Sequence, residues 1–97
     1  MNRFDLAGRN AIVTGAAKGI GAAIAERFLD SGAAVALWDI DADRLADTAA
    51  RLGALGTVTA HRVDITDPQA IAAAAQASVA ASGGIDILVN NAGTVGT

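Results

Sequence analysis

Three glycines stand close together near the start of the chain, in the stretch Thr14-Gly15-Ala16-Ala17-Lys18-Gly19-Ile20-Gly21. A loop that turns sharply needs residues without a Cβ atom, and such a loop lets a ligand approach the backbone. Where the loop opens a helix, unpaired N–H groups and the helix dipole attract an anion such as a pyrophosphate. Lys18 would add a positive charge there. The glycine spacing differs from G-x-G-x-x-G, so simple turn formation is the alternative.

An acid follows this loop at a distance that suits recognition of a ribose. Asp39 lies 18 residues after Gly21, close to the roughly 20 expected for an acid that binds the adenosine ribose of a dinucleotide. Its carboxylate would repel a 2′-phosphate and therefore favours NAD over NADP. Lys18 argues for NADP, but the repulsion between carboxylate and phosphate is the more direct effect. Asp39 could instead cap the next helix, although Asp41 is better placed for that.

Four short apolar runs alternate with three helical patterns along the chain. We predict strands over residues 10–14, 34–38, 57–63 and 85–89, and helices over residues 20–31, 42–52 and 68–82. Apolar residues at helical spacing predict the buried faces of these helices, with Ile20, Ile24 and Phe28 on the first, Leu45, Ala49 and Leu52 on the second, and Ile71, Ala75 and Val79 on the third. Trp38 is expected to pack in the core.

Strands joined by helices run parallel, and the helices then cover both faces of the sheet. Right-handed crossovers predict a doubly wound, Rossmann-like α/β fold with strand order 3-2-1-4. In such open sheets, ligands bind outside the carboxyl ends of the strands. A plain α/β sandwich without a ligand is the alternative, and the loops after the strands decide between the two.

The amino-acid composition excludes several classes of protein. The chain has 97 residues, 53% of them apolar, which is enough for one domain with a core. A net charge of −3 argues against nucleic acid as a partner. The chain contains no cysteine, which excludes disulfides and thiolate catalysis. No signal peptide or membrane span of roughly 18 apolar residues is present. We therefore expect a soluble cytoplasmic protein, with no metal site.

Three motifs together carry a family resemblance. Thr14-Gly15-x-x-x-Gly19-Ile20-Gly21, then Asp64-Ile65, then Asn90-Asn91-Ala92-Gly93 resemble the short-chain dehydrogenase/reductase family, and the resemblance covers the whole chain. It implies that the cofactor-binding residues are Gly15, Lys18, Gly19, Ile20 and Gly21 at the pyrophosphate, Asp39 at the ribose, Asp64 and Ile65 at the adenine, and Asn91, Ala92 and Gly93 along the cofactor. Asn90 would tie neighbouring strands together. Asp64 as a polar helix entry, and Asn90-Asn91 as a turn, are the alternatives.

The resemblance also implies an activity, an NAD(P)-dependent interconversion of a secondary alcohol and a ketone, with a 3-oxoacyl group as one candidate substrate. In this family a Tyr, a Lys four residues later, a Ser and an Asn perform the chemistry. The chain has no Tyr, and its single Lys is Lys18 in the phosphate loop. We therefore expect no catalytic residue among residues 1–97.

Residues 1–97 are then expected to be the N-terminal part of one NAD(P)-binding domain, inactive alone, in a protein that forms a homotetramer. A non-catalytic dinucleotide-binding or sensing module is an alternative function. A domain for another adenosine-containing ligand, such as a methyl donor, is a further alternative, but it gives no reason for Asn90-Asn91-Ala92-Gly93.

Overall fold

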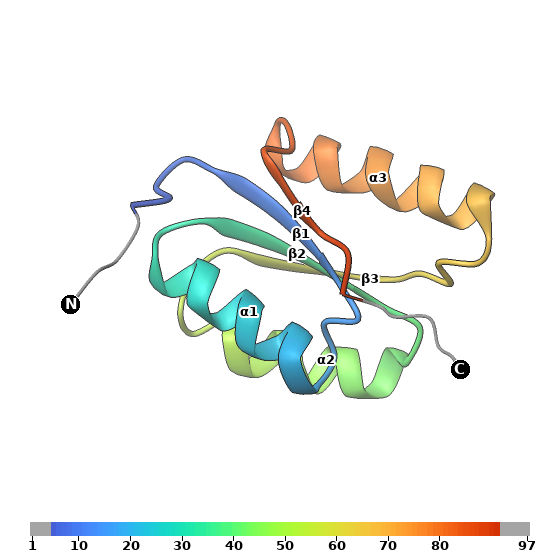
Figure 1. Cartoon of the computed structure of the whole chain (residues 1–97), viewed down its shortest axis with the longest axis horizontal. Helices are drawn as coiled ribbons and strands as arrows, with labels where there is room; N and C mark the ends of the chain where they lie inside the picture. The colour runs from blue at the N-terminus through green and yellow to red at the C-terminus, as the bar shows by residue number, and fades with distance from the viewer. Residues whose placement is uncertain (1–4, 92–97) are drawn as a thin grey trace.

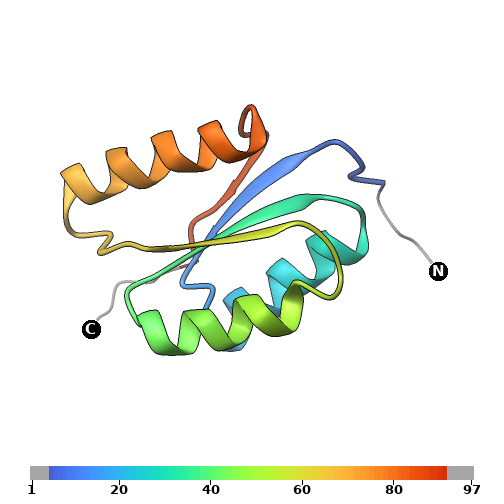
Figure 2. The same cartoon turned by 180° about the vertical axis from the view of Figure 1, so that it is seen from behind.

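The computed structural model describes residues 5–91. A four-stranded parallel sheet lies between two helical layers (Figure 1). The elements are β1 (Asn10–Thr14), α1 (Gly19–Asp30), β2 (Ala34–Asp39), α2 (Ala42–Leu52), β3 (Val58–Arg62), α3 (Pro68–Ser82) and β4 (Ile87–Val89). The strand order β3-β2-β1-β4 confirms the predicted topology. Seen from either side, α1 and α2 cover one face of the sheet and α3 covers the other (Figures 1 and 2).

Side chains alternate between the two faces along the central strands. One core cluster, on the side of α1 and α2, contains Ala11, Val13, Val35 and Leu37. The other, on the side of α3, contains Ile12, Ala36 and Trp38, as expected for the tryptophan. The strands pair in register, with Thr14 opposite Trp38 and Asp39 opposite Arg62. The loops that follow the strands therefore meet at one edge of the sheet.

The predicted buried face of α1 was wrong at its first residue. Ile20 is 72% exposed, whereas Gly21, Ala22, Ala25 and Leu29 are buried. Ile24 and Phe28 are only partly buried against the core. The buried face of α1 lies one residue later in the sequence than predicted. Small side chains allow the start of α1 to lie directly on the loop after β1, which accounts for the shift. Ile20 is thereby left at the mouth of that loop.

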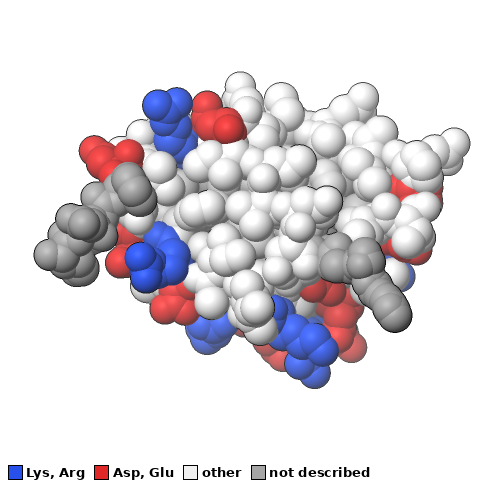
Figure 3. Space-filling model, in the orientation of Figure 1, with Lys and Arg blue, Asp and Glu red and all other residues white. Residues whose placement is uncertain are grey.

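The predicted face of α3 was wrong at Ile71 and Val79, which are exposed, whereas Ala75 is partly buried against the core. The buried residues of this helix are Ala74 and Ser78. The helix has no charged residue, so no polar side indicated its rotation in advance. A specific contact fixes the rotation instead, since the Trp38 indole N–H donates to the buried Ser78 hydroxyl at 3.1 Å. Figure 3 shows that the surface over α3 is largely free of charged side chains.

Two strands are shorter than predicted. β3 covers Val58–Arg62 and β4 covers Ile87–Val89. Before β4, the Asp86 N–H donates to the Asn10 carbonyl at 2.8 Å, and the Asn10 N–H donates to the Asp86 carboxylate at 2.8 Å. Within residues 5–91, β4 is an edge strand, with Leu88 64% exposed. None of the helices described is long and apolar enough to span a bilayer.

Candidate functional site

The loop between β1 and α1 is held against the end of β2. Gly15 and Gly19 have φ angles of +61° and +62°, which other residues rarely adopt. Ala16 and Ala17 are buried between them. The Ala16 N–H donates to the Trp38 carbonyl at 3.1 Å. The Ala17 N–H donates to the Asp39 carboxylate at 3.0 Å. These two N–H groups therefore point to β2 and are not donors for a ligand.

The donors for an anion come from the first turn of α1. Lys18 is the N-cap residue, and its carbonyl accepts the first helical bond, from the Ala22 N–H at 3.4 Å. The N–H groups of Lys18, Gly19, Ile20 and Gly21 precede that bond and are the free donors of a helix N-terminus. N–H groups of this kind, together with the dipole of a helix, attract anions such as a phosphate group.

Gly21 brings the helix and the loop into contact. A Cβ atom at Gly21 would lie 2.1 Å from the Gly15 carbonyl oxygen and 2.7 Å from Nδ2 of Asn91. The Asn91 side chain donates to the same Gly15 carbonyl at 3.3 Å. Asn91 thus attaches the end of β4 to the loop. Its neighbour Asn90 accepts a hydrogen bond from the Thr14 hydroxyl at 3.2 Å, so it links β4 to β1.

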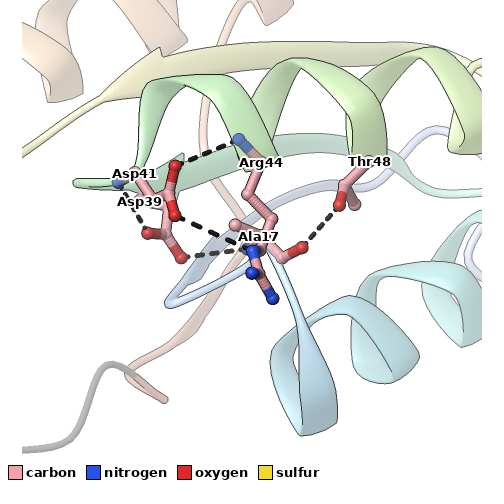
Figure 4. A network of polar contacts seen from close by, with 5 residues as sticks. All are labelled: Ala17, Asp39, Asp41, Arg44 and Thr48. Carbon is pink, nitrogen blue, oxygen red and sulfur yellow. Dashed lines mark hydrogen bonds and ion pairs between the residues drawn. The ribbon is translucent and has the colours of Figure 1, made fainter.

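Asp39 joins two loops through both of its carboxylate oxygens (Figure 4). Oδ2 accepts from the Ala17 N–H and Oδ1 accepts from the Asp41 N–H, each at 3.0 Å. Asp41 caps α2 by accepting from the Arg44 N–H at 3.1 Å, as the sequence predicted. Each oxygen of an ionised carboxylate can accept more than one hydrogen bond, so Asp39 keeps capacity for the hydroxyls of a ligand.

Asp64 follows β3 and forms a turn with Thr66. Its Oδ1 accepts from the Thr66 hydroxyl at 2.6 Å and from the Thr66 N–H at 2.9 Å. These bonds, the hydroxyl first, hold the pKa of Asp64 below its ordinary value because they stabilise the ionised form. Asp67 caps α3, accepting from the N–H groups of Gln69 and Ala70. Asp64 therefore takes part in the helix entry and keeps Oδ2 for a ligand.

One cleft at the carboxyl edge of the sheet collects the residues that follow three different strands. It has a volume of about 180 Å3 and is lined by Gly15, Trp38, Asp39, Ile40, Val63, Asp64 and Ile65. The predicted residues Gly15, Asp39, Asp64 and Ile65 thus lie together. Lys18 and Gly19 line a different, open groove beside α2, together with Arg44. Ala92 and Gly93 lie outside the described residues.

Sequence reasoning missed Thr48, a buried residue of α2 that lies against the loop. Its hydroxyl donates to the Ala17 carbonyl (Figure 4). The signal was its spacing, because Thr48 falls between Leu45 and Leu52 on the core face of the helix. A hydroxyl buried on such a face needs a hydrogen-bond partner.

The depressed pKa of Asp64 leads to a prediction on acid titration. A carboxyl whose folded pKa is lowered adds stability above its unfolded pKa, here 3.8, and this stability is lost as the pH falls through the folded value. Thr66→Val removes the hydroxyl bond, so we expect the Asp64 pKa to rise toward 3.8, whereas Thr66→Ser keeps it low. Carboxyl carbon shifts in an NMR titration measure both. Equal midpoints in the two variants would contradict the prediction.

The sequence and the fold both match known proteins. The profile of a family described as short chain dehydrogenase matches residues 9–97. The chain is 49% identical over 90 residues to a 2-dehydro-3-deoxy-L-rhamnonate dehydrogenase (NAD(+)) of Sphingomonas sp. (strain SKA58), covering 93% of this chain and 35% of that protein. It is 47% identical over 91 residues to a rhamnolipids biosynthesis 3-oxoacyl-[acyl-carrier-protein] reductase of Pseudomonas aeruginosa, covering 94% and 36%.

Among solved structures, a short chain dehydrogenase from Mycobacterium smegmatis superposes with a TM-score of 0.92 at 38% identity, covering 99% of this chain and 42% of that one. The chain thus spans about a third of the length of the curated relatives it matches.

Proposed function

The chain belongs to the short chain dehydrogenase family, and on that basis we propose that the protein is an NAD(P)-dependent oxidoreductase that interconverts a secondary alcohol and a ketone. In this proposal, residues 1–97 form the N-terminal part of a single Rossmann-type domain and bind the cofactor. The residues that act on the substrate belong to a part of the protein outside these 97 residues.

The observation that carries the proposal is the convergence of Gly15, Asp39 and Asp64 in one cleft. They come from three loops far apart in the sequence, and all lie at the carboxyl edge of a parallel sheet, where this kind of fold binds its ligands. Beside them lies the first turn of α1 with its free N–H groups. Two carboxylates beside an anion site suit adenosine diphosphate, which offers hydroxyls and an exocyclic amine next to its phosphates.

Each residue has a role in holding the cofactor. The N–H groups of Lys18, Gly19, Ile20 and Gly21 would bind the pyrophosphate. Asp39 would accept from the ribose hydroxyls, and Asp64 would accept from the adenine amine, with Ile65 beside the ring. Asn91, Ala92 and Gly93 would extend along the rest of the cofactor. When bound, the nicotinamide gives or takes the hydride.

We propose NAD as the preferred cofactor. Asp39 is half-buried in the cleft, where its negative charge would repel the 2′-phosphate of NADP. The similar rhamnonate dehydrogenase carries NAD(+) in its name. Lys18 and Arg44, which line the neighbouring groove, are the cations that would meet a 2′-phosphate. The choice of cofactor therefore depends mainly on Asp39.

The substrate is proposed only as a class. The two similar enzymes are named for 2-dehydro-3-deoxy-L-rhamnonate and for a 3-oxoacyl-[acyl-carrier-protein], and both names specify a ketone. The cytoplasmic location stays a prediction from the composition, and the homotetramer stays a prediction from the family resemblance.

The test is a binding and turnover experiment on the full-length protein that carries these residues. Calorimetry should detect NAD, and ADP should compete for the same site. Oxidation of a panel of secondary alcohols should produce reduced nicotinamide, measured by its absorbance. The 97-residue chain alone should give no turnover. If the full-length protein bound neither NAD, NADP nor ADP, the proposal would be refuted; binding without turnover would favour the sensing module.

A further inference from the structure

Ala17 is held on both sides by residues from different elements. Its N–H donates to Asp39 at the end of β2, and its carbonyl accepts from the Thr48 hydroxyl on α2 (Figure 4). Ala17 is 3% exposed and Thr48 is 6% exposed. A hydroxyl within a helix commonly bonds the carbonyl one turn earlier in its own helix. In this structure the Thr48 hydroxyl is directed out of α2 and into the loop.

The bond from Thr48 sets the orientation of one peptide group. In a trans peptide the carbonyl and the following N–H point in opposite directions. Because the Ala17 carbonyl points to α2, the Lys18 N–H points away from α2. Lys18 is the N-cap of α1, with extended backbone angles of −158° and 172°, and it is followed by Gly19 with its positive φ. The direction of the first free donor of α1 therefore depends on the peptide that Thr48 holds.

Without the hydroxyl, the Ala17 carbonyl would be buried with no donor from α2. A buried carbonyl without a partner is unfavourable, and rotation of the peptide between Ala17 and Lys18 would relieve it. Gly19 makes such a rotation easy because glycine accepts many backbone conformations. The rotation would turn the Lys18 N–H away from its present direction and disturb the donors behind it.

We propose that Thr48 is a positioning residue for the cofactor, which keeps the pyrophosphate-binding turn in its binding conformation through the Ala17 carbonyl. This inference rests on the proposed function. Thr48 itself would not touch the cofactor, since it is buried behind the loop. Its effect should therefore appear on the phosphates and not on the adenosine.

The experiment compares Thr48→Val with Thr48→Ser in the full-length protein. Val has nearly the shape of Thr but no hydroxyl, whereas Ser keeps the hydroxyl. We expect Thr48→Val to raise the dissociation constants of NAD and ADP about tenfold and that of adenosine less than twofold. Thr48→Ser should bind all three nearly as the wild type does. Thr57→Val makes the same chemical change at an exposed site and should change nothing.

The split between ADP and adenosine separates a positioning role from a merely structural one. A residue that only stabilised the fold would lower the melting temperature and leave both affinities of the folded protein unchanged. Equal affinities of wild type and Thr48→Val for ADP would overturn the inference, as would an equal loss for ADP and adenosine. Should Thr48→Val not fold, Thr48→Ala removes the hydroxyl without adding bulk and is measured in the same way.

The outcomes for the wild type keep the two proposals apart. A wild-type protein that binds none of NAD, NADP and ADP refutes the proposed function itself. A wild-type protein that binds ADP, with a Thr48→Val variant that binds it equally well, refutes only the role of Thr48.

Discussion

Gly21→Ala is expected to raise the dissociation constant of the dinucleotide about a hundredfold. The new methyl group would lie 2.1 Å from the Gly15 carbonyl oxygen and 2.8 Å from the Gly15 carbonyl carbon. Both are backbone atoms, so no side chain can move aside. The methyl group would also lie 2.7 Å from Nδ2 of Asn91, the atom that donates to the Gly15 carbonyl. The start of α1 must therefore shift away from the loop, and its free N–H groups shift with it.

The size of the effect follows from overpacking. Extra methyl groups in packed positions cost about 1–3 kcal/mol, and a loss of about 3 kcal/mol in binding corresponds to a dissociation constant about a hundredfold higher. Calorimetry with NAD measures the dissociation constant. The rise in melting temperature that NAD produces is a second measure of the same binding.

Gly84→Ala is the matched control for this substitution. A Cβ at Gly84 has no atom within 4 Å, and Gly84 lies after α3, far along the chain from the loop. We expect this variant to bind NAD as the wild type does. If Gly21→Ala did the same, the contact between helix and loop would not be needed for the site.

Asp39→Ala is expected to narrow the preference for NAD over NADP. Hydrogen bonds that involve a charged group are worth about 1.5–3 kcal/mol, so affinity for NAD should fall about tenfold to a hundredfold. The affinity for NADP should fall less, because the 2′-phosphate of NADP no longer meets a carboxylate while Lys18 stays nearby. The measurement is the ratio of kcat/KM for the two cofactors.

A second consequence of Asp39→Ala is a loss common to both cofactors. The substitution also frees the Ala17 N–H, which Asp39 holds at 3.0 Å. Asp30→Ala removes the same charge from an exposed position at the C-terminal end of α1, away from the cleft, and should leave the ratio unchanged. A ratio that Asp39→Ala does not change would count against a role for this carboxylate at the ribose.

The topology could be predicted from the sequence because its signals are local and repeated. Apolar runs of strand length alternate with helices, and a parallel sheet has few ways to connect them. The cap at Asp41 and the glycine loop were equally local. The rotation of α3 could not be predicted, since a helix without charges presents apolar residues on every side. It depends on a bond between Trp38 and Ser78, forty positions apart in the chain.

The composition of the site was only partly visible in the sequence. The motif residues Gly15, Asp39 and Asp64 do meet in one cleft. Their bonds to the protein itself could not be foreseen, because they depend on how the loops lie. Asp39 binds two N–H groups, and Thr48 reaches a loop from a neighbouring helix. Motif spacing indicates which residues approach a ligand. The residues that hold those side chains and loops in position can be recognised only from the folded structure.

The side chains of β2 point alternately to the two faces of the sheet, and this limits how many residues can be deleted from the strand. Leu37 points into the core under α1 and α2, and Trp38 into the core under α3. Deleting one residue between Ala34 and Leu37 would turn every later side chain of the strand to the opposite face. The Asp39 carboxylate would then point toward α3 and away from Ala17. Deleting two residues would preserve its face, so the parity of the strand, more than its length, keeps this acid beside the loop.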